Sequence, residues 1–154
     1  DLKIIFTKAN SDTNGRVINK MIDKYVKENE DSTIAFTSLG QLRYLSAMQY
    51  VDLVIGNSSS GIIEAPSFKV PTINIGHRQK GRVQGDTIIN CNPIDEEIIK
   101  AIKLGLSDDF KDAIKYSKNP YGEGDMSKLI IDEIKNFFFS SQIDLKKKFY
   151  DIKF

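Results

Sequence analysis

Hydrophobic residues in this chain gather in five short runs that are rich in Ile and Val. Within each run apolar residues occupy consecutive positions, which is typical of strands buried on both faces of a parallel sheet. We therefore expect strands over residues 2–7, 33–37, 52–56, 71–75 and 87–90.

The segments between these runs carry apolar residues at helical spacing. The clearest case is an amphipathic helix expected over residues 13–30, with Asp12 or Thr13 as its cap. Its apolar positions are Val17, Met21, Ile22 and Tyr25. Two further helices are expected over residues 41–50 and 61–67.

A fourth helix is expected to carry Pro93 in its first turn, with Glu96 and Glu97 near its positive end. Strands that alternate with helices predict an α/β fold with a Rossmann-like, doubly wound parallel sheet. Ligands in such sheets bind beyond the carboxyl ends of the strands. The loops that follow residues 7, 37, 56 and 75 are therefore expected to line one crevice.

The pattern beyond Leu106 is purely helical, with helices expected over residues 108–116, 125–138 and 143–154. The turn Asn119-Pro120-Tyr121-Gly122-Glu123-Gly124 contains two glycines that can take positive φ. The end is rich in aromatic residues, which either pack on this domain's own sheet or cover a neighbouring domain. We place a Rossmann-like domain at 1–138 and a C-terminal crossover helix or tail, which would dock on an absent neighbouring domain, at 139–154.

Composition narrows the function classes. The 154 residues fit one domain, and a net charge of +1 argues against a nucleic-acid binder, which would show a basic stripe. No apolar run approaches the ~18 residues of a membrane span, and no signal peptide is visible. The single cysteine, Cys91, fits a reducing compartment, so we expect a cytoplasmic protein. The chain opens inside a strand without Met, as a piece of a longer protein would.

The candidate chemistry begins at Gly56-Asn57-Ser58-Ser59-Ser60-Gly61, here named the serine turn (residues 56–61). Glycines, free backbone amides and three hydroxyls suit a phosphate or diphosphate. Glu64 lies just over one helical turn further on, where a carboxylate suits sugar hydroxyls better than a phosphate. A plain loop with a serine cap would look the same, and the spacing alone does not choose between the two.

A second cluster is Gly76-His77-Arg78-Gln79-Lys80-Gly81-Arg82, here named the cationic loop (residues 76–82). Arg78 or Arg82 could neutralise phosphates, because a guanidinium matches phosphate oxygens in a bidentate manner. A solvated basic loop is the alternative. His77 is the only histidine, and one His with one Cys gives no basis for a metal site. No base lies near the serines, so no nucleophilic serine is expected.

The run GNSSSGIIEAPSFKVPTINIGHRQKGR resembles the hydrolysing UDP-N-acetylglucosamine 2-epimerases of sialic-acid and related nonulosonic-acid biosynthesis. Asn10-Ser11-Asp12 is similar to that family's Asn-x-Asp turn, and residues 119–124 with Ser127 are similar to its Tyr-Gly-Asp/Glu-Gly segment. The related non-hydrolysing enzymes usually carry Asp-Ser-Gly-Gly at the serine turn. Lys8-Ala9 stands where the family tends to have proline, so Lys8, Ala9 and His77 are left without roles.

The resemblance implies the second of two Rossmann-like domains of a GT-B-type enzyme, with terminal helices that cross back to the first. By position, it implies UDP contacts from Asn10, the backbone near Leu39, Ser58, Ser59, Glu64 and Arg78. Glu64 would hold the ribose hydroxyls, while the serines and the helix start would hold the diphosphate. It implies no cofactor and leaves a homo-oligomer open for the full-length protein.

The family reaction eliminates UDP to a glycal and hydrates it to the free 2-epimer, such as N-acetylmannosamine. The resemblance implies that the acid and base lie upstream of this segment, so the chain alone should be inactive. Its implied partners are UDP or a UDP-sugar and the missing N-terminal domain. Two alternatives are the nucleotide-sugar domain of a GT-B glycosyltransferase and a non-catalytic, flavodoxin-like binding module. Which sugar is used, N-acetylglucosamine or a di-N-acetylated 6-deoxy relative, stays open.

Overall fold

The computed structural model of the chain describes residues 2–10, 13–122 and 124–140. It divides into two compact units, Asp1–Asp52 and Leu53–Phe154, and each is described here by itself. Within the described residues, no helix is both long enough and apolar enough to cross a membrane.

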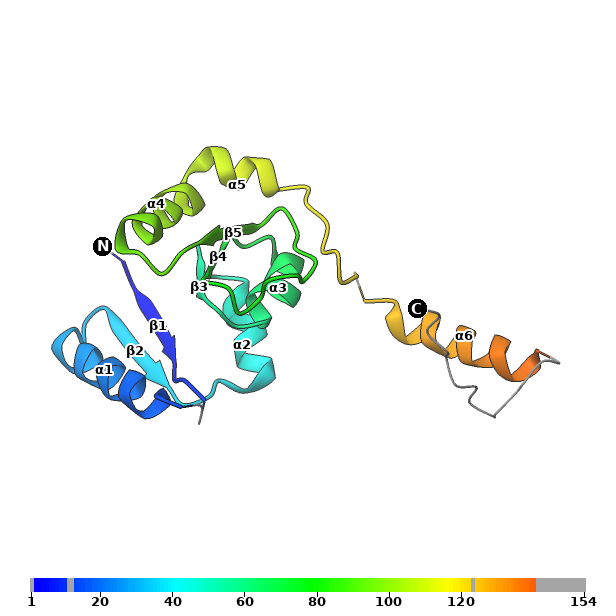
Figure 1. Cartoon of the computed structure of the whole chain (residues 1–154), viewed down its shortest axis with the longest axis horizontal. Helices are drawn as coiled ribbons and strands as arrows, with labels where there is room; N and C mark the ends of the chain where they lie inside the picture. Colours follow the sequence, from blue (N-terminus) through cyan, green and yellow to red (C-terminus); the bar gives the residue numbers. More distant parts are fainter. Residues whose placement is uncertain (1, 11–12, 123, 141–154) are drawn as a thin grey trace, which may run out of the picture. The chain divides into compact units, whose positions relative to one another are not determined.

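The first unit is one strand–helix–strand repeat followed by a helix (Figure 1). Strand β1 (Ile4–Thr7) and strand β2 (Thr33–Phe36) pair in parallel, with Ile4 opposite Thr33. Helix α1 (Gly15–Glu28) connects them, and α2 (Gly40–Met48) follows β2. Parallel pairing confirms the strand prediction for this unit.

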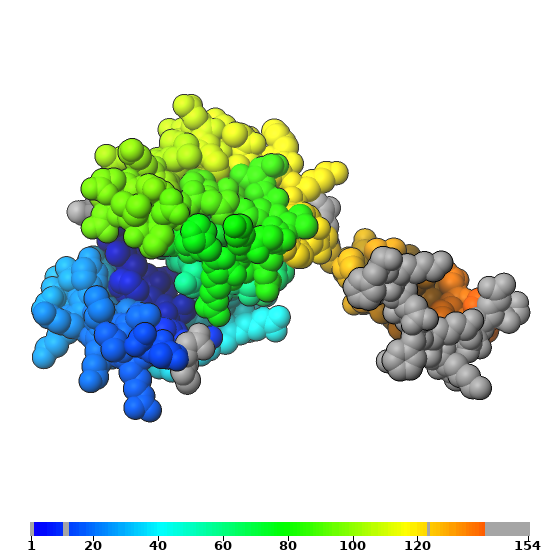
Figure 2. Space-filling view, in the orientation of Figure 1, coloured from blue at the N-terminus to red at the C-terminus, as the bar shows by residue number. Residues whose placement is uncertain are grey.

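Helix α1 differs from its prediction in its start and in its buried face. It begins at Gly15 after Asn14, whose φ is 71° and whose side chain makes no capping bond, so Thr13 is not the cap. Asp12, the other predicted cap, lies outside the described residues. The helix turns Gly15, Asn19, Ile22 and Val26 inward, one line at helical spacing, while Val17 and Met21 stay exposed. Figure 2 shows side chains of α1, in blue, standing out from the surface of this unit.

The second unit contains a three-stranded parallel sheet in the order β3-β4-β5. Its elements are β3 (Val54–Gly56), α3 (Ser60–Ile63), the 3₁₀ helix η1 (Ala65–Phe68), β4 (Thr72–Ile75), β5 (Ile88–Cys91), α4 (Asp95–Leu106) and α5 (Asp108–Ile114). Ile62 and Ile73 are fully buried between the helices and the sheet. The α/β fold with parallel strands is as the sequence predicts.

Helices cover both faces of this sheet. A Cβ added to Gly61 of α3 would lie 2.9 Å from Cγ2 of Thr72, whereas one added to Gly105 of α4 would lie 3.3 Å from Cδ1 of Ile89. Successive residues of a strand point to opposite faces, and Thr72 lies opposite Ile88, the neighbour of Ile89. The two helices therefore lie on opposite faces, which is the doubly wound arrangement.

The structure corrects the start of one predicted helix and the continuity of another. Helix α4 begins at Asp95, two residues after Pro93, so Pro93 precedes the first turn instead of occupying it. Glu96 and Glu97 do lie in that first turn, as predicted. The helix expected over 61–67 is split, because α3 ends at Ile63 and the chain continues as η1, which contains Pro66.

Helix α6 (Met126–Phe139) follows the turn at residues 119–124, in which Gly122 and Gly124 both have positive φ, as predicted. None of its residues is buried, and its exposed apolar side chains are Met126, Leu129, Ile130, Ile131, Ile134, Phe137, Phe138 and Phe139. The helix predicted over 143–154, and most of the tail placed at 139–154, lie outside the described residues.

Candidate functional site

The serine turn and the cationic loop meet at one edge of the second unit's sheet. They follow β3 and β4, which are neighbouring parallel strands, so both leave from the carboxyl edge. Gln79 joins them: its side chain is 4 % exposed, and its Nε2 donates a 2.8 Å hydrogen bond to the carbonyl oxygen of Asn57. The structure thus brings the loop of Ser58 and Ser59 together with the loop of Arg78.

Two backbone amides of the serine turn have no partner in the described part of the chain. Oγ of Ser58 accepts a hydrogen bond of 3.4 Å from the amide of Ser60, whereas the amides of Ser58 and Ser59 donate to no described residue. Helix α3 has only four residues, so its dipole is smaller than a full helix would supply. The donors available here are chiefly individual amides and hydroxyls.

Glu64 lies where α3 gives way to η1. Its backbone is engaged, because its amide donates to Ser60 (2.9 Å) and its carbonyl oxygen accepts from Ser67 (3.0 Å). Its side chain is exposed and forms no ion pair with any described residue. The carboxylate is therefore held beside the serine turn and is open to a ligand.

The cationic loop carries unpaired positive charge. Arg78, Lys80 and Arg82 are exposed, and in the part of the chain that the structure describes none forms an ion pair with a carboxylate. The loop starts at Gly76, whose φ of 75° lies in the left-handed region that glycine adopts without a steric penalty. Because Gln79 is buried in its middle and bonds to Asn57, the loop is anchored to the protein.

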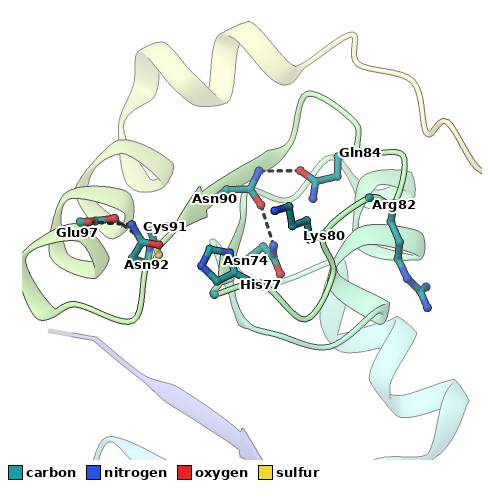
Figure 3. A pocket seen from close by; sticks show the side chains of 11 residues that line it. Asn74, His77, Lys80, Arg82, Gln84, Asn90, Cys91, Asn92 and Glu97 are labelled. Atoms are coloured by element: carbon teal, nitrogen blue, oxygen red, sulfur yellow. Dashed lines mark hydrogen bonds between the residues drawn. The ribbon is translucent and has the colours of Figure 1, made fainter.

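A pocket of about 530 Å³ opens beside this loop, on the β5 side (Figure 3). Its lining residues are Asn74, Gly76, His77, Lys80, Gly81, Arg82, Gln84, Asn90, Cys91, Asn92 and Glu97. Three amides form a chain along its wall: Asn74 donates to Asn90 at 2.7 Å, and Asn90 donates to Gln84 at 2.7 Å. A wall of amides with nearby cations can accept an anionic or hydroxyl-rich ligand.

The far wall of the pocket contains a carboxylate and a thiol. The amide of Asn92 (2.9 Å) and its Nδ2 (3.1 Å) both donate to Glu97, and these bonds lower the pKa of that carboxyl. Burial, and then the negative charge of Glu97, raise the pKa of the Cys91 thiol. Cys91 is thus kept neutral and is a poor nucleophile at physiological pH.

Asn10 and Leu39, the other two predicted contacts, belong to the first unit. Asn10 follows β1, and Leu39 lies between β2 and α2, so both stand at the carboxyl edge of that unit's sheet. Asn19 fixes the chain just before Asn10, because it accepts from the amide of Ala9 (2.8 Å) and donates to its carbonyl oxygen (3.1 Å).

Lys8, left without a role by the sequence, forms an ion pair with Asp23 of α1 at 2.6 Å. Sequence reasoning missed Lys8, Asn19, Gln79 and the three amides of the pocket wall. Their partners lie 6 to 22 residues away along the chain, and no local pattern marks such contacts. Among the described residues, no three His, Cys, Asp or Glu side chains gather as a metal site would require.

Comparison with known proteins shows which family and which proteins this chain resembles. Residues 1–135 match the family model described as UDP-N-acetylglucosamine 2-epimerase. A Campylobacter jejuni protein named GDP/UDP-N,N'-diacetylbacillosamine 2-epimerase (hydrolyzing) is 48% identical over 99 residues, which are 63% of this chain and 26% of that protein. The Escherichia coli polysialic acid biosynthesis protein P7 is 37% identical over 148 residues, 96% of this chain and 37% of that protein.

A solved structure assigned as a UDP-N-acetylglucosamine 2-epimerase from Listeria monocytogenes has a similar fold. The TM-score is 0.59 with 19% identity, and the match covers 98% of this chain and 49% of that one. The chain therefore spans between about a quarter and a half of the length of these proteins.

Proposed function

Because the chain belongs to the UDP-N-acetylglucosamine 2-epimerase family, we propose that it is the UDP-binding half of a hydrolysing enzyme of this family. One observation carries the proposal. The hydrogen bond from buried Gln79 to Asn57 holds an anion-binding turn and an unpaired cationic loop together at one sheet edge. That edge is where parallel α/β sheets bind nucleotides.

The diphosphate is assigned to Ser58, Ser59 and Arg78. The free amides and hydroxyls of the two serines can donate to phosphate oxygens, and these donors need no rearrangement. Arg78 supplies a guanidinium without a competing carboxylate in the described part of the chain. Amides, hydroxyls and one guanidinium are suited to two adjacent phosphates.

The ribose is assigned to Glu64. A carboxylate beside phosphates is repelled by them, so hydrogen bonds from another group must offset the repulsion. The ribose next to a diphosphate offers two hydroxyl donors for this purpose. Glu64 has a fixed backbone and an open side chain, which fits this role. Asn10 and the backbone near Leu39, from the first unit, are assigned to the rest of the nucleotide.

The whole enzyme would eliminate UDP and hydrate the resulting glycal to a free 2-epimer. The Ser-rich serine turn supports the hydrolysing type, and so does the printed name of the Campylobacter jejuni relative. The relatives are named for different sugars, one for diacetylbacillosamine and one for polysialic acid biosynthesis. We therefore assign an N-acetylated amino sugar as the substrate class, within nonulosonic-acid or sialic-acid biosynthesis.

The catalytic acid and base are assigned to a further domain, since the chain spans only part of its relatives. The exposed apolar side chains of α6 support docking against that domain, with residues 139–154 as the crossing tail. The chain alone would bind nucleotide and would not turn over a UDP-sugar. A single free cysteine supports function in the reducing cytoplasm.

The test is an NMR titration of the ¹⁵N-labelled chain with UDP. We expect the amide signals of Ser58, Ser59, Glu64 and Arg78 to shift together along one binding curve, because all four are assigned to one ligand. The variant Glu64→Ala should weaken binding of UDP roughly 5- to 20-fold and bind 2'-deoxy-UDP about as well as UDP.

The matched control is Glu96→Ala, an exposed carboxylate in the first turn of α4 that is not assigned to the nucleotide. It should leave both affinities unchanged. Shifts that spare the serine turn and the cationic loop, or a Glu64→Ala chain that still prefers UDP to its 2'-deoxy form, would refute the assignment.

A further inference from the structure

The segment between α5 and α6 contacts the chain that directly follows each of the two loops of the candidate site. Asn119 is 9% exposed, and its Nδ2 donates to the carbonyl oxygen of Ile63 (2.8 Å) and to Oγ of Ser67 (2.7 Å). Its Oδ1 accepts from the amide of Tyr121 at 2.9 Å. One buried amide thus ties this segment to the chain on both sides of Glu64.

Tyr121 makes the second connection. Its hydroxyl donates a 2.9 Å hydrogen bond to the carbonyl oxygen of Val83, the residue directly after the cationic loop. Pro120 packs closely at the same place, since a Cβ added to Gly85 would lie 3.2 Å from its Cδ. Residues 119–121 therefore contact the chain that follows the serine turn and the chain that follows the cationic loop.

These contacts complete the anchoring of the cationic loop. The amide of Gly76 donates to the carbonyl oxygen of Cys91 (2.8 Å) at the start, Gln79 bonds to Asn57 in the middle, and Tyr121 holds Val83 at the end. Arg78 lies between the first two anchors. The third anchor adds to the bond between Gln84 and Asn90, which also holds this end of the loop.

The bond from Tyr121 contributes little to the core. Tyr121 is 37% exposed and Val83 is 63% exposed, so its loss would leave no buried polar group unpaired. Its effect should therefore fall on the order of the cationic loop, not on the folding of the unit. This separates a positioning role from a general contribution to stability.

We propose that Asn119 and Tyr121 are positioning residues that hold the serine turn and the cationic loop at the spacing a diphosphate needs. The proposal rests on the proposed function, in which a nucleoside diphosphate binds between these loops. Neither residue needs to touch the ligand. Their effect is transmitted through Ile63 and Ser67 on one side and through Val83 on the other.

The test compares Tyr121→Phe with Tyr116→Phe in the whole 154-residue chain. Tyr121→Phe removes only the hydroxyl that bonds Val83, whereas Tyr116 is 81% exposed and its hydroxyl has no described partner. We expect Tyr121→Phe to speed hydrogen exchange of the Lys80 and Arg82 amides roughly 3- to 10-fold. Affinity for UDP should fall by a similar factor, and affinity for uridine should not change.

Asn119→Asp provides a second variant that does not depend on the tyrosine. It keeps the acceptor for the Tyr121 amide and loses the donors to Ile63 and Ser67, so UDP affinity should fall while uridine affinity stays. If either variant weakens UDP and uridine equally, or if Tyr121→Phe behaves as Tyr116→Phe does, the positioning role is wrong.

Hydrogen exchange separates this proposal from the proposed function. If the wild-type chain does not prefer UDP to ADP, the nucleotide assignment fails. The exchange rates of Lys80 and Arg82 then still show whether Tyr121 orders the loop, with inorganic diphosphate in place of UDP as the binding probe.

Discussion

Two groups of polar side chains surround the carboxyl edge of the second sheet, and they differ in what they contact. Gln79 and Asn119 are buried and bond to backbone carbonyl oxygens of other segments. Ser58, Glu64 and Arg78 are exposed, and their side chains form no ion pair with the described residues. The first group fixes the backbone, which leaves the second group available for a ligand.

The sequence correctly placed the two loops that follow β3 and β4 at one sheet edge. Ser58 stands two residues beyond β3 and Arg78 three residues beyond β4, so the strand pattern alone places them at a common edge. It failed for Gln79 and Asn119, whose partners lie 22 and 56 residues away. In the first unit the same holds for Asn19, which fixes Ala9 across ten residues.

The environment of Cys91 makes a prediction about reactivity. Burial and the charge of Glu97 raise the pKa of the Cys91 thiol. At a pH near the pKa of an ordinary cysteine, a smaller fraction of Cys91 is therefore thiolate in the folded chain than in the unfolded chain. At pH 8, alkylation by iodoacetamide should be slower in the native protein than in urea. The variant Glu97→Gln should speed it in the native protein, because the repelling charge is gone.

Glu96→Gln is the matched control for that experiment, since it removes a neighbouring exposed carboxylate that is not a cause of the Cys91 shift. It should leave the native alkylation rate as in the wild type. Equal native and unfolded rates, or equal effects of the two variants, would contradict the account of this pocket wall.

At the scale of elements, helix α3 positions the serine turn by packing against the sheet. It is only four residues long, yet Ile62 is fully buried and Gly61 lies directly against Thr72 of β4. The sequence predicts a single helix here because it shows an apolar run after the serines. Pro66 has no amide hydrogen to donate within a continuous α-helix, and the chain changes to a 3₁₀ helix there, which the apolar run does not reveal.

Gly61→Ala should therefore destabilise the second unit and move the serine turn. The new Cβ would lie 2.9 Å from Cγ2 of Thr72, which forces α3 away from the sheet. Urea denaturation should show a loss of about 1–3 kcal/mol in the free energy of unfolding. The double variant with Thr72→Ser, which removes the opposing methyl, should lose less than the sum of the two single variants. Strict additivity would show that the contact is not the cause.

The first residues of helices α4 and α1 are also not predicted from the sequence. Helix α4 is predicted from its apolar spacing, but its first residue is Asp95, because Asn92 is bonded to Glu97 across the start of the helix. Helix α1 starts from Asn14 with a left-handed backbone instead of from a side-chain cap. The spacing of apolar residues predicts whether a segment is a helix or a strand. Where the element begins and ends depends on hydrogen bonds and backbone conformations that this spacing does not show.

At the scale of the whole molecule, the described chain consists of two α/β units, each with a parallel sheet. Asn10 and Leu39 stand at the carboxyl edge of one sheet, and Ser58, Glu64 and Arg78 stand at or near that of the other. The family match spans residues 1–135 and therefore includes both units. The strand pattern predicts parallel α/β structure in both units, whereas one domain is expected over residues 1–138 and the division into two compact units is not predicted from the sequence.

The most direct test of the central claim is calorimetric titration of the chain with UDP, beside UMP and ADP. Half of a binding site should give a Kd of about 0.1–1 mM for UDP, which corresponds to roughly 4–5.5 kcal/mol. UMP should bind more weakly because it lacks the second phosphate, and ADP because it carries the wrong base. Equal binding of UDP and ADP, or no UDP binding by a folded chain at millimolar concentration, would contradict the assignment of this chain as the UDP-binding half.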